Sequence, residues 1–276
     1  QSVSGMKPIL TLPSEDFVAI AESLFAQELS DEVTPAKPPA AMAAITEQQL
    51  TFLHTFGFLR LPGLFADEIE EITEAFETVF AAPDNYRMDM NEPLHRNDRR
   101  VIIPMFIDHH PTLTRLREDE RILGVARAIL GDDAEYAESD GNLAFCHSEW
   151  HADTYGAPMS TRHIKLSFYL DPLRADSGAI RVLPGTQYWQ SPYAKDLRRS
   201  FREFGKSADV FGVDSTEVPA VVVDSDPGDV LIWDYRLVHA SFNGLDRRRF
   251  FSVNFRERMA ESTSDPVAPA RSASAN

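Results

Sequence analysis

The stretch VPAVVVDSDPGDVLIWDY, residues 218–235, decides the fold. Two short runs rich in β-branched and aromatic residues, 218–223 and 230–235, flank the turn Asp226-Pro227-Gly228. Apolar runs of this length, bounded by Pro, Gly and Asp, are typical of β-strands. Further strands are expected at residues 143–147, 163–170, 179–183 and 250–255. Many short strands separated by turns predict an antiparallel barrel or jelly roll.

The first half of the chain has a helical pattern instead. A helix capped by Ser14 is expected over residues 14–29, and the Pro-containing stretch 32–44 is expected to be a linker. Thr46 and Gln49 form a capping box for a second helix, which directs Leu50, Leu53 and Phe56 inward and ends at Gly57; a short strand follows at 58–61. Further amphipathic helices are expected around residues 69–79 and over 113–130, closed by Gly131.

These patterns predict one domain over residues 1–260, with a helical part to about residue 133 and a jelly-roll core from about residue 134. The helices are expected to pack on the outside of the barrel. Residues 261–276 are rich in Ser, Ala and Pro and are expected to be a disordered tail.

Composition limits the possible partners. The formal net charge is -16, with 43 acidic and 27 basic residues, and such a field repels phosphate backbones and anionic lipids. We therefore expect a small-molecule substrate, with neither nucleic acid nor membrane as partner, and leave the oligomeric state open. Cys146 is the one cysteine, so no intrachain disulfide can form, and a cytoplasmic location is expected.

One tripeptide suggests a metal site. His151-Ala152-Asp153 places an imidazole and a carboxylate on the same face of an extended strand, and His239 follows the later apolar run. Two histidines and one carboxylate leave positions open on a metal, as in non-haem iron(II) oxygenases. His147-Ser148-Glu149 is a competing tripeptide of the same phase, so the spacing alone leaves the choice open.

Three motifs occur in a fixed order around this tripeptide. They are Trp150-His151-Ala152-Asp153, the segment 176–186 (DSGAIRVLPGT), and the segment 227–241 (PGDVLIWDYRLVHAS). Together they resemble the phytanoyl-CoA dioxygenase family over about residues 57–256, departing at Gln187, where a histidine is common. The resemblance implies a cupin-like jelly roll, the double-stranded β-helix. It also implies iron(II) held by His151, Asp153 and His239, with 2-oxoglutarate as co-substrate and dioxygen as oxidant.

The resemblance also implies an arginine for 2-oxoglutarate, shortly after His239. Strand alternation places Arg248 on one face with Ser252, four residues later as in the family, so Arg248 is chosen and Arg247 is the alternative if the register shifts. A planar guanidinium can bind the distal carboxylate of 2-oxoglutarate bidentately. By resemblance, Ser241 adds a hydroxyl to the same carboxylate, and Ser167 is a weaker candidate.

The implied reaction is hydroxylation of an aliphatic carbon of a small or medium polar metabolite, with release of succinate and CO2. The alternative is a non-redox cupin-type protein, either a metal-dependent isomerase or a small-molecule-binding module, because jelly rolls host many functions. Arg96, Arg99 and Arg100 lie in an expected irregular segment, 84–104, beside the barrel. For these arginines the sequence favours a solvated basic cluster over contact with substrate.

Overall fold

The structure, a computed structural model, describes residues 45–82, 88–89, 100–144, 147–154, 159–204, 212–244 and 247–258. These residues belong to one compact unit that spans residues 43–276. The expected helix over 14–29, the linker, the tail over 261–276 and Cys146 lie outside the described residues. A single domain over residues 1–260 therefore stays a prediction.

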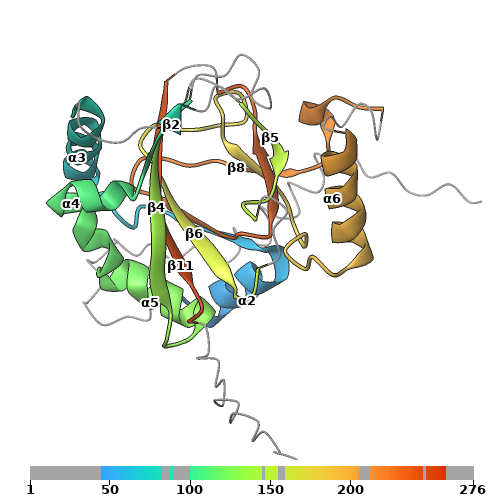
Figure 1. Ribbon diagram of the computed structural model, residues 1–276, viewed down its shortest axis with the longest axis horizontal. Helices are drawn as coiled ribbons and strands as arrows, with labels where there is room; N and C mark the ends of the chain where they lie inside the picture. Colours follow the sequence, from blue (N-terminus) through green and yellow to red (C-terminus); the bar gives the residue numbers. More distant parts are fainter. Residues whose placement is uncertain are drawn as a thin grey trace, which may run out of the picture. The chain divides into compact units, whose positions relative to one another are not determined.

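Two antiparallel sheets form the core of this unit (Figure 1). The larger sheet has the strand order β1 (Phe58–Leu61), β9 (Val230–Asp234), β6 (His163–Tyr169), β11 (Arg248–Arg256), β4 (Glu135–Ala144), β3 (Arg100–Pro104) and β2 (Met88–Asp89). The smaller sheet has the order β5 (Ser148–His151), β10 (Val238–Ser241), β7 (Ile180–Leu183) and β8 (Val221–Val223). This is the expected jelly roll, mainly β with flanking helices.

Helices cover the outer faces of both sheets. The elements α2 (Glu47–Phe56), α3 (Ile69–Ala81), α4 (Pro111–Thr114) and α5 (Glu120–Leu130) share an apolar core with the larger sheet. Helix α6 (Pro192–Phe204) packs on the smaller sheet through Leu197 and Phe201. In Figure 1, α3, α4 and α5 lie on one side of the strands and α6 on the other. The described residues also include the short 3-10 helices η2 (Phe106–His109), η3 (Arg115–Arg117) and η4 (Ser215–Glu217).

A second apolar cluster lies between the two sheets. Leu231 and Trp233 of β9 meet Ile180 and Val182 of β7 there, and all four side chains are buried. Apolar side chains that alternate towards the facing sheet hold the two layers together. The cluster therefore fixes the inner face of β9, from which Trp233 reaches the site described below.

Helix α2 begins and ends where the sequence predicts. Thr46 and Gln49 make both bonds of the capping box, and Gly57 ends the helix in the left-handed region at φ 88. Leu53 is buried as expected. Phe56 is 40% exposed, so the prediction that its side chain points inward was wrong. Phe56 is the last residue of the helix, where its ring packs against Phe52 instead of reaching the core.

The helix expected over residues 113–130 is interrupted. It divides into α4, η3 and α5, because the Asp119 side chain accepts the backbone N–H of Arg121 and starts α5 as a new helix. His110 caps α4 in the same way, with Pro111 at its first position. Apolar periodicity continues across this break because Leu113, Leu116 and Ile122 all face one core. A continuous period therefore does not guarantee one continuous helix.

Several strands differ from the expected bounds. Strand β4 begins at Glu135 rather than 143, and residues 218–220 of the expected strand 218–223 precede β8 as coil. Part of the segment expected to be irregular, residues 84–104, forms β3 and β2. Strands β5 and β10 and helix α6 were not assigned as separate elements. The missed strands are short or carry polar residues towards a cavity, so their apolar alternation is weak.

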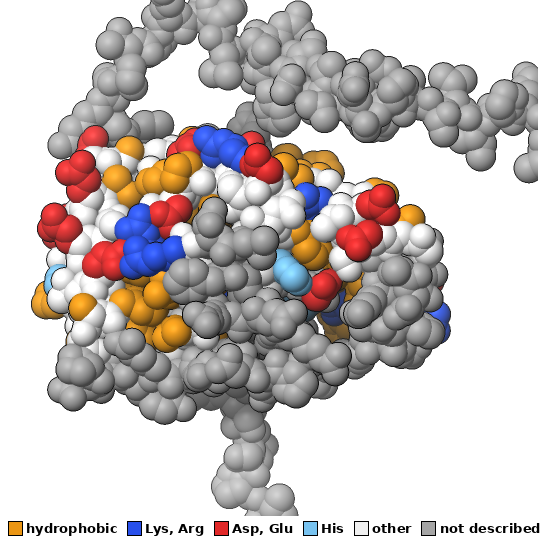
Figure 2. Space-filling model, turned by 90° about the horizontal axis from the view of Figure 1, so that it is seen from above, with side chains coloured by type: hydrophobic (Ala, Val, Ile, Leu, Met, Phe, Trp, Pro, Cys, Tyr) orange, Lys and Arg blue, Asp and Glu red, His pale blue; other side chains and the backbone are white. Residues whose placement is uncertain are grey.

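The surface carries mixed charge. On the face drawn in Figure 2, acidic and basic side chains lie next to one another in several places. Pairs such as Arg115 with Glu68, whose nitrogen and oxygen are 3.0 Å apart, are solvent-exposed and contribute little stability each. Among the described residues, none of the helices has both the length and the apolar character that crossing a membrane requires.

Candidate functional site

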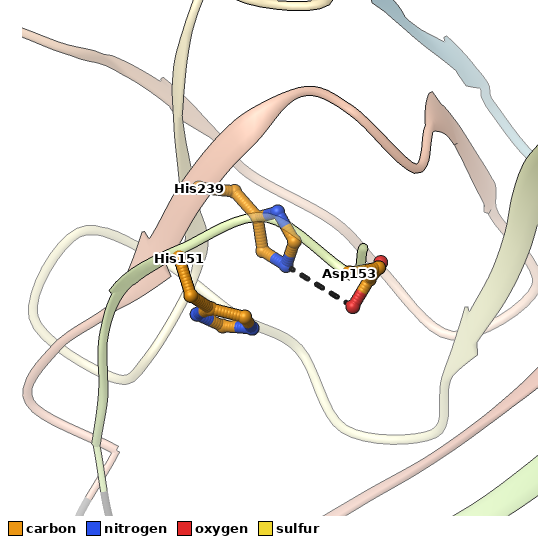
Figure 3. A group of neighbouring side chains, drawn as sticks. All are labelled: His151, Asp153 and His239. Atoms are coloured by element: carbon orange, nitrogen blue, oxygen red, sulfur yellow. Dashed lines mark ion pairs between the residues drawn. The ribbon is translucent and has the colours of Figure 1, made fainter. Parts of the chain in front are cut away.

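Two short paired strands bring two histidines together. His151 ends β5 and His239 lies in β10, and the two residues are direct partners across the antiparallel pair. Their imidazole centroids are 4.3 Å apart. Asp153 lies two residues beyond His151, and its carboxylate points back towards both rings (Figure 3). The ligand atoms of these three residues, hereafter the triad, all lie within 4.8 Å of one another.

Hydrogen bonds set the tautomer of both histidines. Nδ1 of His151 lies 2.7 Å from the carbonyl oxygen of Glu149, and Nδ1 of His239 lies 3.0 Å from that of Leu237. A carbonyl oxygen only accepts, so each Nδ1 carries the proton and each Nε2 keeps a lone pair. Burial lowers the pKa of His151 to about 3 and also lowers that of His239. Both rings are therefore neutral at physiological pH, as a metal ligand must be.

The Asp153 carboxylate is held from two sides. Its Oδ2 accepts a hydrogen bond from Nε1 of Trp233 at 3.0 Å, and its Oδ1 lies 3.4 Å from Nζ of Lys165. Burial acts to raise the pKa of this carboxyl, but the Lys165 charge leads the effects that outweigh burial and hold the pKa well below its ordinary value. The Oδ1 atom also lies 3.9 Å from Nε2 of His239. The triad thus presents two neutral nitrogens and one ionised oxygen.

The competing tripeptide is placed elsewhere. His147 and Glu149 face each other at 3.8 Å with about two fifths of each side chain exposed. Among the described residues, the triad is the one group of three that brings potential ligand atoms together. The grouping supports the choice of His151 and Asp153 over His147 and Glu149, and their role as metal ligands stays a prediction.

A cavity of about 440 Å³ opens from the triad into the space between the sheets. Arg248, Ser241 and Ser167 all line it, and all three are buried. Nη1 of Arg248 donates to the carbonyl oxygen of Gly178 at 2.6 Å and also contacts the Ser241 hydroxyl, which itself donates to the same carbonyl. The three residues chosen from the sequence thus share one cavity with the triad.

The arginines that flank Arg248 point the other way. Arg247 pairs with Glu77 of α3, with nitrogen and oxygen 2.6 Å apart. Arg249 pairs with Glu77 and Asp171 on the same outer side. The expected register of this strand therefore holds, and the alternative Arg247 lies outside the cavity.

Gln187 stands at the departure from the expected histidine. Its Nε2 donates to the carbonyl oxygens of His54 and Thr55, both at 3.1 Å, at the last turn of α2. The residue therefore joins the segment after β7 to the end of a helix and lies apart from the triad.

The sequence patterns did not identify several residues of the cavity. Trp233 and Lys165 contact Asp153, while Arg100 of β3 and Asp140 of β4 line the cavity. Strand alternation could have found Lys165, because it lies two residues before Ser167 on β6. The assignment of Arg100 to a solvated cluster was wrong, because β3 carries it into the cavity. Arg96 and Arg99 lie outside the described residues.

The sequence profile of phytanoyl-CoA dioxygenase matches residues 53–250, most of the chain. The chain belongs to the phytanoyl-CoA dioxygenase family. A relative is an ectoine dioxygenase of Sphingopyxis alaskensis (strain DSM 13593 / LMG 18877 / RB2256), 26% identical over 223 residues, which are 72% of this chain and 71% of that one. The protein is thus an oxidoreductase that uses iron, 2-oxoglutarate and dioxygen. This membership decides against the non-redox isomerase or binding module.

Solved structures with the same fold support the jelly-roll assignment. The carbocyclase SnoK from nogalamycin biosynthesis superposes with a TM-score of 0.60 at 19% identity, over 80% of this chain and 87% of that one. HygX from Streptomyces hygroscopicus, solved with nickel and 2-oxoglutarate bound, superposes with a TM-score of 0.59 at 19% identity, over 78% of this chain and 88% of that one. Identities this low show the shared fold alone.

Proposed function

We propose that His151, Asp153 and His239 hold the iron. The observation that carries this proposal is that both imidazoles donate a hydrogen bond from Nδ1 to a backbone carbonyl oxygen. The lone pairs of both Nε2 atoms are therefore left beside an ionised carboxylate. Such outer contacts fix the orientation of metal ligands. Bound there, iron supplies the redox chemistry by which dioxygen and 2-oxoglutarate yield succinate, CO2 and an oxidised substrate.

We further propose that Arg248 binds the distal carboxylate of 2-oxoglutarate. Arg248 is 3% exposed and lines the cavity. Gly178 and Gly244 enclose it closely, since a Cβ at either position would lie within 3 Å of Nη1. A buried guanidinium held in one orientation suits bidentate contact with a carboxylate. Ser241 would place its hydroxyl beside the same carboxylate, and Ser167 lines the neighbouring wall.

The proposed reaction is hydroxylation of an aliphatic carbon in a small or medium polar metabolite. The cavity supports this class because polar and charged side chains of β4, β6 and β11 share its wall with aromatic rings. A volume of about 440 Å³ is in the range of small-molecule sites. Polar groups at fixed positions can orient one carbon of the substrate towards the triad.

Succinate release tests the proposal directly. The purified chain, loaded with iron(II) without oxygen, should release succinate from 2-oxoglutarate once air is admitted, faster when a substrate from a panel of polar metabolites is present. Mass spectrometry should then find a product heavier by one oxygen atom. Glu149→Ala should keep this activity, because Glu149 lies outside the triad. Loss of iron binding in Glu149→Ala with retention in Asp153→Ala would contradict the assignment.

A further inference from the structure

Arg100 is a cavity cation for which the proposed cofactor chemistry has no use. We propose that its guanidinium binds a carboxylate of the primary substrate, so that the substrate class is a small carboxylate-bearing metabolite. The proposal rests on the function given above and deepens it. It concerns a residue on a different strand from the triad and from Arg248.

The position of Arg100 follows from the strand register. Arg100 begins β3 and pairs with Ala144 of β4, which pairs on its other side with Arg248 of β11. The two arginines therefore lie in one row of the larger sheet, two strands apart, and both line the cavity. Nη2 of Arg100 donates to Oγ of Ser148 at 2.8 Å, across the cavity on β5. Since β5 also carries His151, Arg100 is joined to the strand of a proposed iron ligand.

The guanidinium is oriented but not neutralised. Its carbon lies 5.8 Å from the centroid of the Phe250 ring, which together with the Ser148 bond restricts its plane. Its Nε is buried and has no hydrogen-bond partner. Within the part of the chain that the structure describes, no carboxylate forms an ion pair with Arg100. A cavity-lining guanidinium without a carboxylate partner among the described residues points to an anionic acceptor supplied from outside the chain.

The other cations of the cavity already have anionic partners or a proposed role. Lys165 lies between Asp153 at 3.4 Å and Asp140 at 3.8 Å. Asp140 also accepts hydrogen bonds from Ser252 and from Asn142 of β4. Arg248 is assigned to 2-oxoglutarate. Among the cavity cations of the described residues, Arg100 is therefore the one left for the primary substrate.

The chemistry of Arg100 and Ser148 favours a carboxylate as their ligand. A planar guanidinium can offer two parallel N–H groups to the two oxygens of a carboxylate. Ser148 accepts from Arg100 and so keeps its own hydroxyl proton to donate to the same anion. Held in this way, one end of the substrate is fixed to β3 and β5, one strand from each sheet, and the carbon that reacts is set at a constant distance from the triad.

Acetate and its neutral isostere acetamide provide the probes. In the full chain loaded with manganese(II) and 2-oxoglutarate, the paramagnetic ion broadens the methyl proton resonance of a small molecule that binds nearby. Acetate should be broadened and acetamide much less. Arg100→Gln should weaken acetate binding by about tenfold or more, Arg100→Lys by less, because an ammonium keeps the charge but loses the fork. Arg127→Gln, an exposed arginine of α5, is the matched control and should change nothing.

The 2-oxoglutarate affinity separates this inference from the proposed function. It is read without oxygen from the charge-transfer absorption of the iron(II) complex, and Arg100→Gln should leave it within about threefold of the unmodified chain. A loss as large as that in Arg248→Gln would assign Arg100 to the co-substrate and overturn the inference. Equal broadening of the acetate and acetamide resonances, or acetate binding that Arg100→Gln leaves unchanged, would overturn it too. If the unmodified chain shows no charge-transfer absorption with iron(II) and 2-oxoglutarate, the proposed function itself is refuted.

Discussion

Trp233→Phe tests how strongly the fold orients the proposed iron carboxylate. The indole Nε1 donates to Oδ2 of Asp153 at 3.0 Å, and Trp233 is 4% exposed. A hydrogen bond to a charged group contributes about 1.5–3 kcal/mol. At about 1.4 kcal/mol per tenfold, its loss should weaken iron binding by about ten- to a hundredfold, a range typical of outer contacts to metal ligands.

Trp150→Phe is the matched control. Its Nε1 also donates at 3.0 Å, but to the backbone carbonyl of Ser215, and Trp150 is 6% exposed. Affinity for cobalt(II) or iron(II), measured by competition with a chelator, should fall in Trp233→Phe and stay within about threefold in Trp150→Phe. The melting temperatures of the metal-free variants report any general loss of packing. Equal losses of metal affinity in the two variants, or none in Trp233→Phe, would refute the reasoning.

Alanine at any triad residue should abolish iron-dependent succinate release while the circular dichroism spectrum stays unchanged; full activity in one variant would remove that residue from the triad. Arg248→Ala should raise the Michaelis constant for 2-oxoglutarate by about a hundredfold, since it breaks a buried charge pair worth about 2–5 kcal/mol, and Arg248→Lys should recover part of this. Arg247→Ala, on the outer face, should have little effect, and a large one would reverse the register. Gly178→Ala places a Cβ 2.7 Å from Nη1 of Arg248, so the same Michaelis constant should rise by more than in Gly185→Ala, where nothing lies within 4 Å.

Local signals in the sequence were sufficient where the structure depends on near neighbours. The capping box of Thr46 with Gln49 requires only a three-residue spacing, and it forms as expected. The assignment of Arg248 to the inner face required only the alternation of one strand, because a shift by one residue would exchange Arg248 with the ion-paired Arg247.

Contacts between distant strands could not be derived in the same way. Strand β4 reads EYAESDGNLA, and its polar residues Asp140 and Asn142 face the cavity rather than water, so its pattern resembles a loop. Arg100 meets Ser148 only because β3 and β5 lie on opposite walls of that cavity. Polar residues indicate solvent in most strands, and a polar interior reverses this rule.

The direct pairing of His239 with His151 has a consequence for metal exchange. The hydrogen bonds between β5 and β10 and the apolar cluster behind them hold the two imidazoles side by side. Metal binding therefore does not have to drive folding, in contrast to small zinc domains that unfold when chelated. The metal-free chain should accept manganese, cobalt or nickel in place of iron without refolding. Its preference among these ions then depends on their abundance and intrinsic affinity more than on the shape of the site.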